Sequence, residues 1–193
     1  SSLKNAGLLD LIHENGIEWL NVFAVDNVLQ RIADPCFIGA TITENRSVGA
    51  KVVCKNHPDE KVGVMCLKDN HPSIVEYYEL TPELRDAVDE NGEPAYNFGV
   101  ILNYLFKESE LEDICENTLP LHIVEKKIPY IDDTGTLIKP EEPNGYKFET
   151  LILDMIQMMD TCLPFEVERD KEFAPIKNKT GIDSVESARA LLT

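Results

Sequence analysis

The rest of the chain is interpreted from NVFAVDNVLQRIADPCFIGAT, residues 21–41. With Leu20 this stretch opens on a nearly unbroken apolar run that ends at Val25, as expected of a strand covered on both faces of a parallel sheet. The run stops at Asp26 and Asn27, at the carboxyl end of the predicted strand, where ligands bind in open α/β sheets. A carboxylate there can hold Mg²⁺, which in turn can bridge phosphate oxygens. The alternative is that Asp26 only caps the next helix or a turn.

The bulk composition is that of a single globular domain of 193 residues. Its 18 Lys and Arg residues against 35 Asp and Glu residues give a net charge of −17, which repels nucleic acid and anionic membrane surfaces. We therefore exclude nucleic acid and membrane as partners. The 5 cysteines are odd in number, show no CxxC spacing and mostly sit among apolar neighbours. This usage predicts reduced cysteines in a cytoplasmic protein.

Helices are predicted from apolar spacing and capping residues. Helical spacing predicts helices over residues 3–15 and 148–159, and a short helical turn over 27–33 closed by Asp34-Pro35. Thr81 and Ser184 are predicted N-caps of two more helices. Residues 99–106 are interpreted as a buried helix, and residues 108–115 as a more polar one.

Strands are predicted over residues 37–43, 50–55, 62–68, 73–80 and 165–168, with extended pieces over 122–131 and 135–138. A turn at Asp69-Asn70 predicts a hairpin between residues 62–68 and 73–80. Because helices alternate with strands, the sequence predicts an α/β protein with a mixed, mostly parallel sheet and helices on both faces.

Six segments resemble a known family, in order and in register. They are VDNVLQRIADPCFIG (25–39), GAKVVCKNHPDEKVGV (49–64), IVEYYEL (74–80), LPLHIVEKKIPYID (119–132), IKPEEPNGYKFE (138–149) and FEVERDKEFAPIKN (165–178). Together they are similar to the eukaryotic UDP-N-acetylhexosamine (UDP-N-acetylglucosamine) pyrophosphorylases, and the resemblance covers almost the whole chain.

The resemblance implies a Rossmann-like (GT-A-like) nucleotidyltransferase fold, with residues 1–193 as part of one catalytic domain. It implies a cytoplasmic enzyme that joins UTP and N-acetylglucosamine 1-phosphate into UDP-N-acetylglucosamine and pyrophosphate, with Mg²⁺ as cofactor. The family's glycine-rich nucleotide loop does not occur in these residues. We therefore expect an internal piece of a longer protein, without its N-terminal loop and its C-terminal region.

The reaction implied by the resemblance needs two anions held in line and their charge neutralised. The resemblance also implies which residues bind the phosphates. Asp26 matches the family aspartate that binds the nucleotide phosphates, through Mg²⁺. Lys147 resembles the lysine that contacts UTP, although a solvated surface lysine is the alternative. Lys177 resembles the lysine on the sugar phosphate. Asp26 and Lys177 are the expected catalytic residues.

Sugar-binding residues are expected in two segments. Glu76 and Tyr77 match the family pair that binds the sugar, and the alternative is an edge-strand glutamate in water. Asn97 and Gly99 are further candidates in NFGVILN, residues 97–103. Val100 departs from the family, which carries a sugar-contacting asparagine there. This departure leaves open a UDP-sugar pyrophosphorylase of different or broader specificity, and the missing loop leaves open an inactive truncated sub-domain.

Overall fold

The centre of the molecule is a six-stranded sheet in the order β10–β2–β5–β3–β4, with β1 also paired to β5. The computed structural model describes residues 2–114 and 117–192. The strands of this sheet are β1 Trp19–Phe23, β2 Val48–Cys54, β3 Val64–Lys68, β4 His71–Val75, β5 Phe98–Lys107 and β10 Cys162–Glu166. The α/β class and the mixed sheet are confirmed.

Most strand pairings of this sheet are antiparallel. Within the described ranges, β10–β2 is parallel, whereas β1–β5, β2–β5, β3–β4 and β3–β5 are antiparallel. The expectation of a mostly parallel sheet is therefore wrong. The reason is β5, which was predicted as a helix and instead forms a long strand between β2 and β1, antiparallel to both. The β1 strand pairs with β5 and is only half-buried along its length. The expectation of a strand covered on both faces is therefore wrong as well.

The helices of the described chain are short. They are α1 Ser2–Asn5, α2 Leu8–Glu14, α3 Pro35–Thr43, α4 Pro82–Arg85, α5 Glu108–Ile114, the 3₁₀ helix η1 Ile152–Met158, α6 Arg169–Glu172 and α7 Val185–Leu191. Thr81 and Ser184 accept hydrogen bonds at the starts of α4 and α7, so both predicted caps are confirmed. The predicted helix over residues 3–15 is interrupted at Gly7, whose φ of 66° lies in the left-handed region.

Residues 37–43 form helix α3 and not the predicted strand. Asp34 is its N-cap, since its side chain accepts a hydrogen bond from the Cys36 backbone N–H, and Pro35 occupies the first turn. Residues 27–33 do not form the predicted helical turn. The predicted helix over 148–159 is divided between β9 Gly145–Glu149 and η1. Residue 115, the predicted end of the helix from 108, lies outside the described residues.

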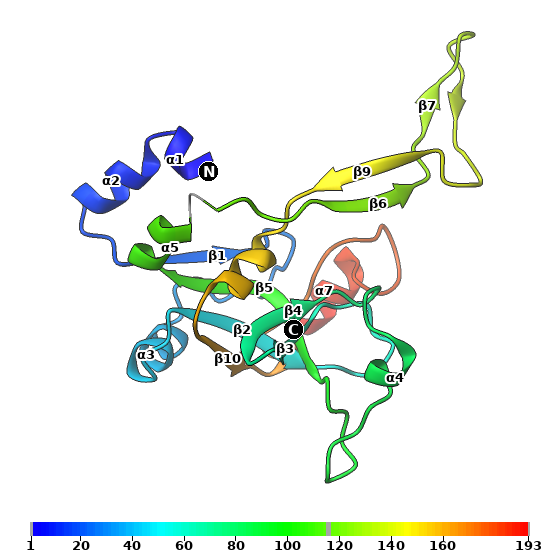
Figure 1. Ribbon diagram of the computed structural model, residues 1–193. Coiled ribbons are helices and arrows are strands. Elements are labelled where there is room, and N and C mark those ends of the chain that lie inside the picture. Colours follow the sequence, from blue (N-terminus) through cyan, green and yellow to red (C-terminus); the bar gives the residue numbers. More distant parts are fainter. Residues whose placement is uncertain (1, 115–116, 193) are drawn as a thin grey trace.

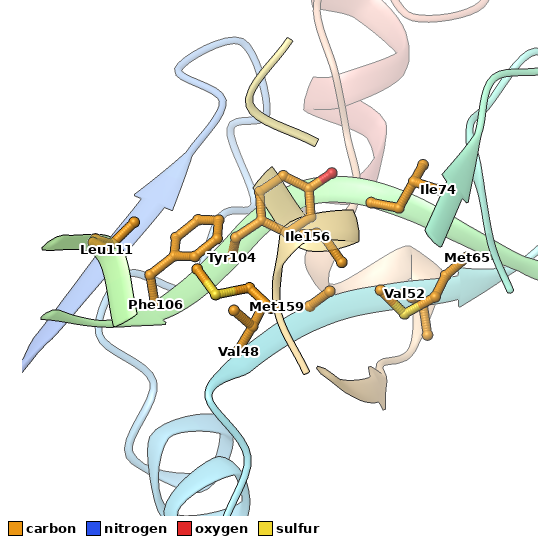
Figure 2. Close-up of a cluster of buried hydrophobic side chains, with 10 residues drawn as sticks. Val48, Val52, Met65, Ile74, Tyr104, Phe106, Leu111, Ile156 and Met159 are labelled. Atoms are coloured by element: carbon orange, nitrogen blue, oxygen red, sulfur yellow. The ribbon is translucent and has the colours of Figure 1, made fainter. Parts of the chain in front are cut away.

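The two faces of β2 carry different layers. Val48, Ala50 and Val52 face a buried apolar cluster that also takes in Leu111 of α5 and Ile156 of η1 (Figure 2). Gly49 and Lys51 face the other side, where Gly49 lies against Phe37 and Thr41 of α3 and the Lys51 ammonium pairs with Glu172 of α6. Helices therefore cover both faces of the sheet, as predicted.

The hairpin between β3 and β4 is confirmed. Lys68 pairs with His71, and Asp69 and Asn70 both have positive φ, at 52° and 66°. Such a two-residue turn matches the twist of the strands that it joins.

A separate arm extends away from the sheet (Figure 1). It consists of β6 His122–Lys126 paired with β9, and of β7 Tyr130–Ile131 paired with β8 Leu137–Ile138. Among the described residues no helix is both long and apolar enough to cross a bilayer.

Candidate functional site

The candidate site is a pocket of about 340 Å³ at the edge of the sheet where β1 and β4 end and β5 begins. Its volume falls in the range of small-molecule sites, about 300–1,000 Å³. It is lined by Ala24, Asp26, Asn27, Lys61, Val62, Gly63, Glu76, Tyr77, Val100, Ile101, Leu102, Tyr104, Leu153, Phe173, Pro175 and Lys177.

Asp26 and Lys177 reach this pocket from opposite ends of the chain. Asp26 follows β1, and Lys177 follows α6. The Ile176 backbone N–H donates to the Asp26 backbone oxygen at 2.9 Å, and Asn27 and Pro175 form an antiparallel bridge. The two segments therefore run side by side and bring a carboxylate and an ammonium group to one cavity.

Glu76 and Tyr77 line the same pocket directly after the last residue of β4. Burial and the nearby carboxylate of Glu79 raise the pKa of Glu76, whereas His122 works in the opposite direction. The Tyr77 ring packs edge-on against Tyr78, with 5.2 Å between the ring centroids. A half-buried carboxylate beside a phenol is suited to binding sugar hydroxyl groups.

One wall of the pocket is apolar and comes from β5. Val100, Ile101, Leu102 and Tyr104 all contribute to it, although side chains of a regular strand would alternate between two faces. The register between β2 and β5 shifts between Ala50 and Val52, and Leu102 has a φ of 52°. This bulge interrupts the alternation, so consecutive residues of β5 line the cavity.

Lys147, Asn97 and Gly99 are not among the residues that line this pocket. Lys147 lies on β9 in the arm, where its ammonium pairs with Glu149. The Asn97 side-chain oxygen accepts a hydrogen bond from the Lys55 backbone N–H at 2.9 Å. A Cβ at Gly99 would lie 3.0 Å from Val62.

Sequence reasoning assigned no role to two of the lining residues, Lys61 and Asn27. Lys61 lies in a charged loop, and it also lines the adjoining cavity together with Lys177. The sequence around Lys61 contains no motif that could have identified it as a binding residue. Asn27 is only 3% exposed, and an amide next to a candidate ligand-binding acid is a signal that sequence could have supplied.

A divalent cation fits this site only if the substrate shares its coordination. The described residues contain no group of three or more His, Cys, Asp or Glu side chains arranged to hold a metal. Mg²⁺, however, is commonly held by one or two carboxylates together with substrate phosphates and water. The Asp26 carboxylate in an open pocket meets that requirement.

Comparison with known proteins shows the family. The sequence profile of the UTP–glucose-1-phosphate uridylyltransferase family matches residues 1–192. The chain belongs to this family. Among its relatives, "UDP-N-acetylhexosamine pyrophosphorylase-like protein 1" of Mus musculus is 40% identical over 185 residues, which is 94% of this chain and 36% of the relative. The UDP-N-acetylglucosamine pyrophosphorylase of Saccharomyces cerevisiae is 38% identical over 205 residues, which is 96% of this chain and 42% of the relative.

Solved structures of similar proteins share the fold. A crystal structure from Entamoeba histolytica, described as a UDP-N-acetylglucosamine pyrophosphorylase, superposes with a TM-score of 0.88 at 35% identity. The match covers 98% of this chain and 48% of that one. The chain thus has the nucleotidyltransferase fold expected from its motifs and spans less than half the length of these relatives.

Proposed function

We propose that this chain is the part of a UDP-N-acetylglucosamine pyrophosphorylase that binds the sugar phosphate and the phosphates of UTP. The proposed reaction joins UTP and N-acetylglucosamine 1-phosphate into UDP-N-acetylglucosamine, with release of pyrophosphate. The observation that carries the proposal is the meeting of Asp26, Glu76 and Lys177 in one pocket. The names of the relatives support the choice of sugar.

The proposed roles follow from the charge of each group. The Lys177 ammonium neutralises the attacking sugar phosphate, since a point charge on a flexible stem can follow a phosphate that changes geometry. Asp26 would hold Mg²⁺, which would supply positive charge to stabilise the phosphate oxygens. Glu76 accepts hydrogen bonds from sugar hydroxyl groups, and Tyr77 lies beside it.

Lys147 is proposed to contact UTP, as the family resemblance implies. In this chain its ammonium pairs with Glu149 on the arm, so contact requires the nucleotide to approach β9. This role and the cytoplasmic location both stay predictions.

The test is pyrophosphate release by the full-length protein from UTP and N-acetylglucosamine 1-phosphate, in wild type and in Asp26→Asn. Because Asp26→Asn removes the carboxylate, turnover should fall by at least about 100-fold, as for the loss of a charge-stabilising group. The response to added Mg²⁺ should weaken as well. Asp133→Asn, an exposed aspartate in the arm, is the matched control and should retain wild-type turnover. Unchanged activity in Asp26→Asn would show that Asp26 is only a turn residue.

A different or broader sugar specificity is the second candidate, and Val100 favours it. Val100 gives the pocket an apolar surface where the family resemblance implies an amide. A panel of N-acetylglucosamine, N-acetylgalactosamine and glucose 1-phosphates separates the two proposals. A preference for glucose 1-phosphate would contradict the first proposal and support this one.

A further inference from the structure

Asn27 joins the two segments that carry the proposed phosphate ligands. Its amide nitrogen donates to the Glu172 backbone oxygen at 2.8 Å, and its side-chain oxygen accepts from the Ala174 backbone N–H, also at 2.8 Å. Asp26 precedes Asn27 directly, and Lys177 lies just past the bonded stretch. One buried amide therefore crosslinks the Asp26 loop to the Lys177 segment.

Backbone hydrogen bonds extend this crosslink on both sides. The Val28 N–H donates to the Ala174 oxygen at 3.3 Å, and the Ile176 N–H donates to the Asp26 oxygen at 2.9 Å. With the bridge between Asn27 and Pro175, these bonds set the register of one segment against the other. We name the bonded segments, residues 26–28 and 174–176, the clasp.

A buried ion triad anchors the clasp to the sheet. Lys51 of β2 is 0% exposed, and its ammonium contacts Asp34 at 2.7 Å and pairs with Glu172. Asp34 is the N-cap of α3, and Glu172 ends α6, two residues before Ala174 in the clasp. The Lys51 ammonium thus holds the start of the Lys177 segment against the centre of the fold.

The triad and the clasp specify geometry more than they supply stability. Replacing a buried ion pair with apolar side chains is often neutral or stabilising. A buried lysine with two carboxylates is therefore weak evidence that the triad exists to stabilise the fold. Directional bonds, in contrast, fix one register between segments. Since a misplacement of about 1 Å can cost about 100-fold in rate, a fixed register matters for in-line transfer.

We propose that Asn27 is a positioning residue, which with the Lys51–Asp34–Glu172 triad sets the placement of Asp26 relative to Lys177 across the pocket. This inference rests on the proposed function for its catalytic consequence. The clasp itself is testable without any activity.

The experiment compares Asn27→Ala with Asn103→Ala in the full-length protein. Asn103 is a matched control, because its side chain is also a buried amide and accepts a hydrogen bond from Asn21 at 2.7 Å. The measurements are amide hydrogen exchange at Ala174 and Ile176, thermal stability, and kcat and KM for each substrate.

Asn27→Ala should expose the Ala174 and Ile176 amides to faster exchange and lower kcat by about 100-fold. It should also raise KM for the sugar phosphate, whereas a mere loss of folded protein lowers the apparent kcat and leaves KM unchanged. Asn103→Ala should destabilise the protein to a similar extent without these changes. Wild-type exchange at Ala174, or equal kcat/KM in the two variants, would overturn the inference.

If Asn27→Ala does not fold, Asn27→Asp tests the positioning role of Asn27 instead. Aspartate retains an acceptor for the Ala174 N–H but cannot donate to the Glu172 carbonyl, so kcat should still fall while the Ala174 amide stays protected. Wild-type kcat in this variant would overturn the inference. If wild type itself releases no pyrophosphate, the proposed function fails, and the exchange rates still decide whether Asn27 holds the two segments together.

Discussion

Lys171 and Lys177 lie on one short segment of the chain, yet only Lys177 lines the pocket. The Lys171 side chain is 71% exposed and pairs with Glu168 at the surface, at 2.7 Å. Surface ion pairs of this kind contribute little. A charge-assisted bond to a bound phosphate contributes about 1.5–3 kcal/mol, so the two lysines should respond differently to truncation.

Lys177→Ala should raise KM for N-acetylglucosamine 1-phosphate by about 10- to 100-fold, the equivalent of one lost charge-assisted bond. KM for UTP should change less, because Lys177 is assigned to the sugar phosphate. Steady-state kinetics with each substrate varied in turn measures both values. Lys171→Ala serves as the control and should match wild type. Equal effects of Lys177→Ala on the two substrates would contradict the assignment.

Glu76 links the pocket to the pH dependence of stability. Its pKa lies above the ordinary value because burial and Glu79 disfavour the carboxylate, so the folded state binds this proton more tightly than the unfolded state does. The contribution of Glu76 to stability is therefore full at low pH and is lost as the pH rises through the folded-state pKa.

Glu76→Gln should raise the thermal midpoint above that of wild type at pH 7, since glutamine carries no charge to desolvate. The advantage should shrink at acidic pH, where wild-type Glu76 is protonated. Thermal unfolding at the two pH values tests this, and an advantage that grows toward acidic pH would show that the sign is wrong. The same variant should bind sugar phosphate more weakly, because a functional group often lowers the stability of the fold that holds it.

At the scale of elements, the packing of α3 on β2 depends on one glycine. A Cβ at Gly49 would lie 2.5 Å from the Thr41 hydroxyl oxygen and 2.6 Å from the Phe37 ring, and both side chains are buried. The helix and strand can approach this closely only because Gly49 has no side chain.

Gly49→Ala should therefore destabilise the protein by about 1–3 kcal/mol through overpacking. Gly39→Ala is a control of opposite sign, because Gly39 is exposed on the same helix with no atom within 4 Å of an added Cβ. In that helix position alanine should stabilise by about 1 kcal/mol. Urea denaturation of both variants provides the comparison, and equal effects would show that the contact at Gly49 relaxes freely.

For the whole molecule, the Lys51 triad connects elements that lie far apart in the sequence. Lys51 comes from β2, Asp34 from the cap of α3 and Glu172 from α6. Burial alone would raise the pKa of Asp34, but the hydrogen bond and charge of Lys51 outweigh it, so this pKa lies below its usual value. The Asp34 carboxylate is therefore held ionised by the buried ammonium.

Lys51→Met should destabilise the protein by about 3–5 kcal/mol, because it leaves buried carboxylates without their cation. Lys107→Met, at the exposed end of β5, should stay within about 0.5 kcal/mol of wild type. Denaturation midpoints at neutral pH measure both. A Lys51→Met protein as stable as wild type would show that the carboxylates take up protons or water instead.

The family, the α/β class and the local signals that depend only on neighbouring side chains can be inferred from the sequence. The caps at Thr81 and Ser184 and the turn at Asp69-Asn70 depend on side chains a few residues apart, so they could be predicted without the fold. The motifs also identified Asp26, Glu76, Tyr77 and Lys177, which the structure places around one pocket.

Whether the apolar runs at residues 37–43 and 98–107 form a helix or a strand depends on tertiary contacts. A short apolar run suits a buried helix as well as a buried strand, and what it packs against settles the outcome. For residues 98–107 the partners are β1, β2 and β3, which lie far away in sequence. The roles of Asn27 and Lys51 depend in the same way on Glu172, which lies far away in the sequence and contacts both. The role of a buried amide or ammonium cannot be assigned until such partners are known.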